Sequence, residues 1–203
     1  MRRHGATHNK AVMPASSSRV MFFLVKVEDV VGIEPREFGR PLKRVVLEKL
    51  SNTYEGLVDE ELGYVVAVID AEVDPIGVLL PKDPASYHKV VCTLLVFIPQ
   101  QQEVVEGEVV DVTEFGAFVR IGIVDALLHL SQIIDDYVSF DRRNMELVAT
   151  KSGLKLGVGD RVRARIVAVS IAGGKVGLTT RQPYLGKLEW IEQQLAPKPP
   201  AKR

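Results

Sequence analysis

The side chains of this chain that are best suited to ligand chemistry are aromatic rather than acidic or nucleophilic. Phe115 and Phe118 lie three residues apart in a segment rich in Val and Gly, and His129 ends the next apolar run. Planar rings on a sheet surface can stack on nucleic-acid bases, which contributes roughly 1–3 kcal/mol per base and tolerates any base. These three residues are therefore candidates for a surface on which bases stack.

The position of the two phenylalanines depends on the local strand geometry. Strict alternation would place Phe115 and Phe118 on opposite faces of a strand. Gly116 can absorb a bulge that brings both rings to one side. In the alternative interpretation both phenylalanines belong to a barrel core and His129 is a surface polar residue. The sequence leaves both interpretations open.

Four arginines are candidates for contacts with phosphate groups. Arg161, Arg163 and Arg165 share one face of a predicted strand, because they alternate with apolar residues. That face could follow a phosphate backbone, and Arg120 could join it from the phenylalanine strand. The alternative is the solvated outer face of a barrel strand, and the spacing does not decide between them.

Catalytic and metal-binding motifs are missing from the sequence. Asp70, Glu72 and Asp74 alternate, but no His accompanies them and Pro75 follows at once, so an exposed acidic strand end is predicted. The single cysteine, Cys92, lies in an apolar run and is predicted to be a small buried hydrophobic residue. We expect no catalytic residues, no metal and no cofactor, and therefore no enzyme activity of the chain alone.

Charge is distributed unevenly along a chain whose net charge is zero. Residues 21–100 carry 8 basic and 13 acidic residues, a net charge of −5, whereas residues 101–203 carry 14 and 13, a net charge of +1. This favours different partners for the two halves and an RNA affinity that is modest and salt-sensitive. No apolar run approaches the ~20 residues of a membrane-spanning helix, and we expect a cytoplasmic protein.

The length of 203 residues allows two small domains. Residues 21–100 predict an α+β domain, RNP-like in its order of one strand, one helix and three strands, with the helix over Pro41–Asn52. Residues 101–185 predict an all-β barrel, because short β-type runs are broken by turn residues. A polar spacer is expected over Ser139–Gly153, and a short helix and tail over 186–203. Residues 1–20 are expected to be a disordered extension or to follow from a start codon assigned too early.

The predicted barrel resembles the S1 family of RNA-binding OB-folds. The resemblance rests on Gly107, Val109, the segment 115–119, Leu128-His129 and Ser131. S1 domains present aromatic residues in this strand and a histidine in the next to stack on single-stranded bases. The resemblance therefore implies the same role for Phe115, Phe118 and His129.

A second resemblance covers both domains. The stretches MFFLVKVEDVVGIEPREFGRPLKRVVLEKL, YEGLVDEELGYVVAVID and KVGLTTRQPYLGKLEWIE are similar to the E-prime family of archaeal DNA-directed RNA polymerase stalk subunits, related to the larger stalk subunit of eukaryotic RNA polymerase II. The resemblance implies a non-catalytic stalk subunit that docks on the polymerase core and pairs with a small helical stalk partner of the F type. Such subunits contact emerging transcript and assist open-complex formation and elongation.

One segment departs from that family. Where the family has a Gly-rich turn, this chain has Pro81, Lys82, Asp83 and Pro84. Two prolines stiffen the turn and remove backbone donors. In the family this tip docks against the polymerase core, so these four residues are expected to lie at the docking site. The alternatives are a free-standing S1 protein of translation or RNA decay, and a ribonuclease or its accessory, against which the absent carboxylate or His cluster argues.

Overall fold

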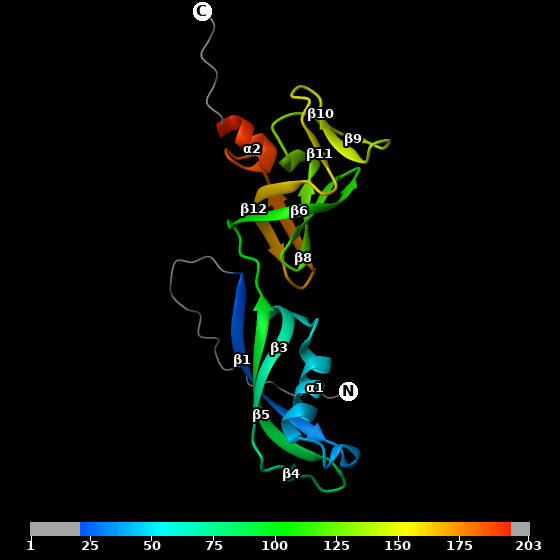
Figure 1. The fold of residues 1–203 in the computed structure, drawn as a ribbon, viewed down its shortest axis with the longest axis vertical. Helices are drawn as coiled ribbons and strands as arrows, with labels where there is room; N and C mark the ends of the chain where they lie inside the picture. Colours follow the sequence, from blue (N-terminus) through cyan, green and yellow to red (C-terminus); the bar gives the residue numbers. More distant parts are fainter. Residues whose placement is uncertain (1–20, 196–203) are drawn as a thin grey trace, which may run out of the picture. The chain divides into compact units, whose positions relative to one another are not determined.

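The computed structural model describes residues 21–195 and divides the chain into two compact units, with the boundary between Ile98 and Pro99 (Figure 1). The predictions for residues 1–20 and for the tail after residue 195 lie outside this range. The N-terminal unit has one sheet and the C-terminal unit has two, and each unit has its own buried core.

The N-terminal unit is an antiparallel sheet with one long helix. Its elements are β1 (Phe22–Ile33), η1 (Pro35–Glu37), α1 (Leu42–Tyr54), β2 (Val58–Asp59), β3 (Gly63–Val73), β4 (Val78–Leu79) and β5 (Ser86–Phe97). The strand order is β1-β5-β3-β2, and the short β4 pairs with β5. The predicted α+β domain is confirmed.

The core of this unit lies between α1 and one face of the sheet. The helix buries one stripe of side chains, which consists of Val45, Val46, Leu50 and Tyr54. The helix extends two residues beyond the predicted end because the Tyr54 ring is buried and its hydroxyl donates to Asp29 Oδ2 at 2.9 Å. Cys92 is fully buried in the facing strand, as predicted.

The acidic end of β3 is exposed, as predicted. Asp70 pairs with Lys43 Nζ at 2.7 Å and Glu72 pairs with Lys26 Nζ at 3.2 Å, so both carboxylates already have cationic partners. The hydrogen bond from Lys43 holds the pKa of Asp70 below its usual value. Within residues 21–195 no group of three or more metal-binding side chains occurs.

The C-terminal unit is a closed five-stranded barrel with additions. Its elements are β6 (Val104–Thr113), β7 (Gly116–Ile121), β8 (Val124–His129), η2 (Leu130–Gln132), β9 (Val138–Asp141), β10 (Glu146–Ala149), β11 (Lys155–Gly157), β12 (Arg161–Ser170), β13 (Lys175–Thr179), β14 (Gly186–Lys187) and α2 (Leu188–Leu195). The strand order β13-β8-β7-β6-β12 closes through pairing of β12 with β13. Because β13 runs parallel to β8 and the other pairs are antiparallel, this is the predicted OB-fold.

The prediction of a polar spacer over Ser139–Gly153 was wrong, because the chain between β8 and β12 forms a second sheet. Strands β11, β10 and β9 pair in that order and bury Leu147, Ala149 and Leu156. Asp136 fixes the β10–β11 turn by accepting the backbone N–H groups of Lys151 and Ser152, both at 2.9 Å. The apolar residues alternate with polar ones, and a half-buried strand resembles a loop in composition when it is this short.

Helix α2 begins at Leu188, two residues later than the predicted 186, because Gly186 and Lys187 pair with β12 as β14. A Cβ on Gly186 would lie 3.1 Å from Trp190, so the glycine lets the indole pack on the strand. Within residues 21–195, no helix has the length and apolar character required to cross a membrane.

Candidate nucleic-acid interface

The barrel places the two phenylalanine rings together on its outside. Along β7 the residues Ala117, Val119 and Ile121 point into the barrel and are fully buried, whereas Phe118 is only partly buried. Phe115 lies in the turn before β7 with 50% of its surface exposed. The two rings meet edge to face, with centroids 6.0 Å apart and an interplanar angle of 90°. The interpretation of Phe115 as core is therefore wrong.

Gly116 allows this arrangement by close approach rather than by a bulge. A Cβ at this position would lie 2.3 Å from the carbonyl oxygen of Leu128 in the neighbouring strand, which no side chain can tolerate. The register shift between β6 and β7 lies instead between Val109 and Asp111. The prediction of a bulge at Gly116 was therefore wrong, although both rings do lie on one side of the sheet.

His129 completes what we call the aromatic surface, formed by Phe115, Phe118 and His129. It ends β8 directly opposite Gly116 and is exposed. The backbone N–H of Ser131 donates to His129 Nδ1 at 3.2 Å, so Nδ1 is an acceptor and Nε2 carries the hydrogen in the neutral ring. This bond fixes the orientation of the imidazole next to the phenylalanine pair.

Ion pairs lie on two sides of the aromatic surface. Two residues beyond Phe118 along β7, Arg120 makes a bidentate pair with Asp125, with Nε–Oδ1 and Nη2–Oδ2 distances of 2.8 and 3.1 Å. Next to Phe115 along the chain, Glu114 pairs with Arg142 from the β9–β10 turn. A phosphate that binds either arginine would have to share the guanidinium with a carboxylate or displace that carboxylate.

Two of the three arginines on β12 pair with a carboxylate whose position the sequence spacing could not reveal. Arg163 donates twice to Glu106 Oε1, at 2.9 and 2.8 Å, and Arg161 lies 3.5 Å from the other oxygen of the same carboxylate. Arg165 donates instead to the side chain of Gln182 at 2.7 Å and to the carbonyl of Gln102 at 2.8 Å. The three side chains lie on the outside of β12, as expected, and two of them are neutralised in part.

Two basic residues near the aromatic surface were missed by the sequence analysis. Arg142 reaches Glu114, and Arg181 donates to the carbonyl of Ser131 at 3.3 Å while pairing with Asp135. Both lie in or next to turns, where no periodicity marks a shared face. Only the fold brings Arg142 to Glu114, 28 positions away, and Arg181 to Ser131, 50 positions away.

The expected docking segment forms a well-ordered turn without glycine. The N–H of Asp83 donates to the carbonyl of Leu80 at 3.1 Å, Pro81 takes the second position, and Lys82 adopts a positive φ of 69° at the third. This is the pattern of a type II turn. Asp83 accepts the N–H of Ala85 at 2.9 Å and the hydroxyl of Tyr87 at 2.7 Å, and these bonds lower its pKa.

The segment before this turn exposes four aliphatic side chains, which we call the apolar tip. They are Ile76 (77% exposed), Val78 (58%), Leu79 (69%) and Leu80 (49%). Beneath them, buried His88 is bonded through Nδ1 to the carbonyl of Asp74 at 2.9 Å and through Nε2 to Ser86 Oγ at 3.1 Å. The tip is therefore tied to β5 although its surface is apolar.

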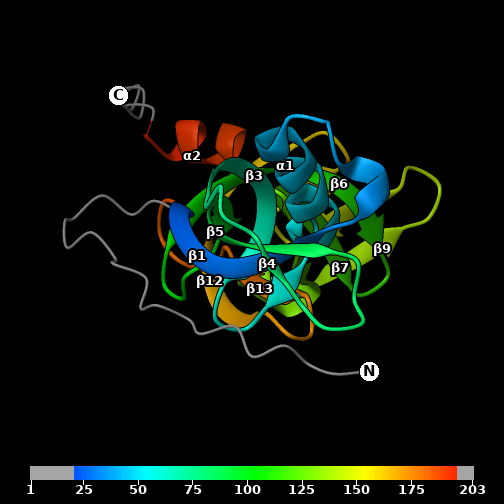
Figure 2. The same ribbon diagram turned by 90° about the horizontal axis from the view of Figure 1, so that it is seen from below.

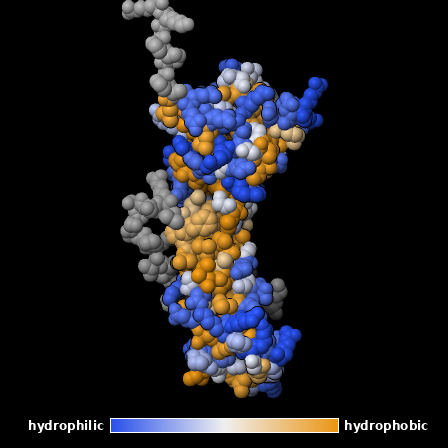
Figure 3. Space-filling model, in the orientation of Figure 1, coloured by the Kyte–Doolittle hydropathy of each residue, from blue (hydrophilic) through white to orange (hydrophobic). Residues whose placement is uncertain are grey.

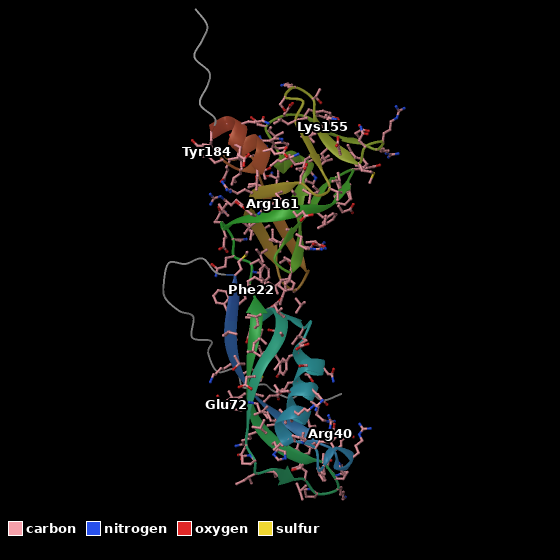
Figure 4. All side chains as sticks on the ribbon, viewed as in Figure 1. Phe22, Arg40, Glu72, Lys155, Arg161 and Tyr184 are labelled. Carbon is pink, nitrogen blue, oxygen red and sulfur yellow. The ribbon has the colours of Figure 1, made fainter. Side chains whose placement is uncertain are left out.

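A further apolar area covers part of the sheet of this unit. In the view of Figure 3, apolar side chains gather over β1 and β5 at the end where Phe22 lies (Figure 4). Leu24 is 65% exposed there, and the Phe22 ring lies 5.0 Å from that of Phe97. Exposed apolar patches of this kind indicate surfaces that contact other molecules.

A closed OB barrel with exposed rings defines the class of single-stranded nucleic-acid-binding modules. Comparison with family models agrees with this class for the C-terminal unit and gives a separate family for the N-terminal unit. Residues 98–181 match the S1 RNA binding domain, and residues 28–84 match the SHS2 domain found in the N terminus of Rpb7p/Rpc25p/MJ0397.

Whole-length relatives give the particular family. DNA-directed RNA polymerase subunit Rpo7 of Saccharolobus solfataricus is 41% identical over 177 residues, which cover 85% of this chain and 98% of that protein. Rpo7 of Sulfolobus acidocaldarius is 38% identical over 179 residues, covering 87% and 98%. DNA-directed RNA polymerase II subunit 7 of Arabidopsis thaliana is 30% identical over 154 residues, covering 74% and 86%. The chain belongs to the Rpo7 family of non-catalytic stalk subunits of DNA-directed RNA polymerase, which confirms the resemblance.

Proposed function

We propose that this polymerase subunit binds single-stranded RNA on the aromatic surface of its barrel. The observation that carries the proposal is the exposed edge-to-face pair of Phe115 and Phe118, with His129 fixed beside it. A base can stack on each exposed ring, and because every base has a π-face the site would accept transcript of any sequence. The rings lie on strands and a tight turn, so little ordering entropy is lost on binding.

We propose the arginines as secondary contacts with phosphate groups. Three of them already pair with a carboxylate: Arg120, Arg161 and Arg163. Replacing that carboxylate by a phosphate would therefore gain only the difference in free energy between the two ion pairs. Arg165 has neutral partners and is the strand residue with most to gain. This arrangement supports modest, salt-dependent binding, as expected for a transcript that must move along the surface.

The experiment that tests this proposal replaces all three rings, in the variant F115A/F118A/H129A. We expect RNA affinity to fall by about 100-fold, since two to three stacking contacts are lost. Fluorescence anisotropy with a labelled oligouridylate measures it, and circular dichroism checks the fold. Tyr184→Ala, which removes a ring that is 58% exposed elsewhere in the unit, is the matched control. Equal affinity of a folded triple variant and the control would remove the assignment.

We also propose that the apolar tip and the turn formed by Pro81, Lys82, Asp83 and Pro84 dock on the polymerase core. Four exposed aliphatic side chains on and beside β4 support this, because such a surface is stabilised by burial against protein. The net charge of −5 of residues 21–100 makes the same surface a poor ligand for RNA.

For the small helical stalk partner of the F type, we propose a heterodimer that covers the apolar area at Phe22 and Leu24. Together, the two proteins would act in the cytoplasm and assist open-complex formation and elongation. Co-expression followed by size-exclusion chromatography tests the pairing. We expect a one-to-one complex that Leu24→Asp disrupts and that Val30→Asp, at another exposed position of the same strand, does not. A chain that stays monomeric with the partner present would remove the proposed pairing.

A further inference from the structure

We propose that the RNA path continues from the aromatic surface onto the turn between β9 and β10, where Arg142 and Arg143 bind phosphate groups. This inference rests on the proposed RNA binding and adds a site on the small sheet, outside the barrel strands. The sheet lies beyond the end of β6, at the side where the chain turns toward β7 (Figures 1 and 2).

An ion pair connects this turn to the aromatic surface. Arg142 pairs with Glu114, which is the neighbour of Phe115 in the chain. The Arg142 guanidinium therefore contacts the residue that directly precedes Phe115, the first proposed stacking ring. A phosphate that follows a base stacked on Phe115 would meet Arg142 before it met the arginines on β12.

Hydrogen bonds hold the turn, and both arginines are exposed to solvent. Asp141 accepts the backbone N–H of Arg143 at 2.9 Å and the side-chain amide of Asn144 at 2.8 Å, and these bonds lower its pKa. The side chain of Arg142 is 77% exposed. For the Arg143 guanidinium, no partner is found among the residues that the structure describes. Guanidinium groups bind phosphate bidentately, so two of them at one turn can hold consecutive phosphates.

The ion pair to Glu114 is easily exchanged for a phosphate. Both of its side chains are largely exposed, 77% and 63%, and pairs of this kind contribute little stability. Arg163, in contrast, is 38% exposed and donates twice to Glu106. Glu114 therefore serves as a replaceable partner that keeps Arg142 beside Phe115 when RNA is absent.

The charge and size of the site agree with this extension. Residues 137–157 contain four basic and two acidic residues, a net charge of +2, whereas the whole span 101–203 has +1. An OB-fold occupies about 4–16 nucleotides of a single strand. Three rings account for only the first few bases, and the remaining strand needs a second surface to follow.

The test measures binding of the full chain to a labelled single-stranded oligouridylate of about 16 nucleotides over a series of salt concentrations. In R142A/R143A, we expect the slope of log affinity against log salt to shrink by about 1.4, the value for two phosphates on a single strand. The variant R142K/R143K keeps both charges and should retain most of the slope. Glu114→Gln removes the competing carboxylate and should tighten binding by about twofold.

The comparison variant R161A/R163A removes two proposed barrel contacts that already pair with Glu106, and it should change the slope less. An unchanged slope in R142A/R143A, or a larger loss in R161A/R163A, overturns the inference and assigns the phosphate path to β12. The triple variant F115A/F118A/H129A separates the two proposals. If it loses RNA binding while R142A/R143A does not, the aromatic surface stands without the turn. If neither set weakens binding, the barrel is not the RNA site.

Discussion

The two units of this chain each expose apolar side chains, but of different shapes and in different surroundings. The barrel presents flat rings, Phe115 and Phe118, on either side of which Arg120 and Arg142 make exposed ion pairs. The apolar tip presents branched aliphatic side chains such as Val78 and Leu79, more than half exposed. Rings with arginines beside them fit bases and phosphates, whereas branched side chains fit the irregular pockets of a protein surface.

The two surfaces are also held in place by different interactions. The rings are fixed by strand geometry, since Gly116 brings two backbones too close for any side chain. The tip is a short segment that includes β4 and is held by side-chain hydrogen bonds, through buried His88 and half-buried Asp83. The proposed RNA site thus lies on the barrel sheet, and the proposed docking site lies on a short segment at the edge of the other sheet. Substitutions can test this contrast in both units.

The largest effect is expected at the tip, in the variant V78D/L79D. Two carboxylates in a contact that buries aliphatic groups should lower the affinity for the polymerase core by about 100-fold or more, while RNA affinity stays unchanged. Pull-down of the core with tagged chain measures it. Val30→Asp, at a residue 55% exposed in the same unit, is the control. Undiminished recovery of the core would place the docking surface elsewhere.

A smaller effect is expected when an aliphatic side chain replaces a ring in the barrel. Phe118→Leu keeps an apolar group beside Phe115 but loses the flat face, so RNA affinity should fall by about three- to tenfold. Phe38→Leu, at a ring that is 53% exposed in the other unit, should leave affinity unchanged. If Phe118→Leu binds RNA as well as the natural chain, apolar contact rather than stacking holds the base.

The smallest effect concerns Asp83 and has a defined pH dependence. The Ala85 N–H and the Tyr87 hydroxyl lower the pKa of Asp83 in the folded chain below its usual 3.8. Its contribution to stability is therefore present above pH 3.8 and is lost as the pH falls through the lowered pKa. Asp83→Asn should melt slightly below the natural chain at neutral pH and equal it in acid. A melting difference that persists in acid would show that the carboxylate charge plays no part.

Much of the fold follows from local patterns in the sequence. The stripe of Val45, Val46 and Leu50 predicted α1, and the alternation in β7 and β12 predicted barrel strands. The short strands β9, β10 and β11 escaped prediction, because three or four residues are too few for alternation to stand out from a polar loop. The end of α1 was also placed too early, since the hydrogen bond from Tyr54 to Asp29 spans 25 residues.

The sequence by itself determined the chemical groups of the proposed RNA site: two phenylalanines, a histidine and a set of arginines at recognisable spacing. Only the tertiary structure decided which of them can act together. It brought the rings edge to face across Gly116, set Glu106 against Arg161 and Arg163, and carried Arg142 to Glu114. The physical reason is that spacing fixes which face of a strand a side chain takes, whereas charge compensation depends on strands that pair from distant parts of the chain.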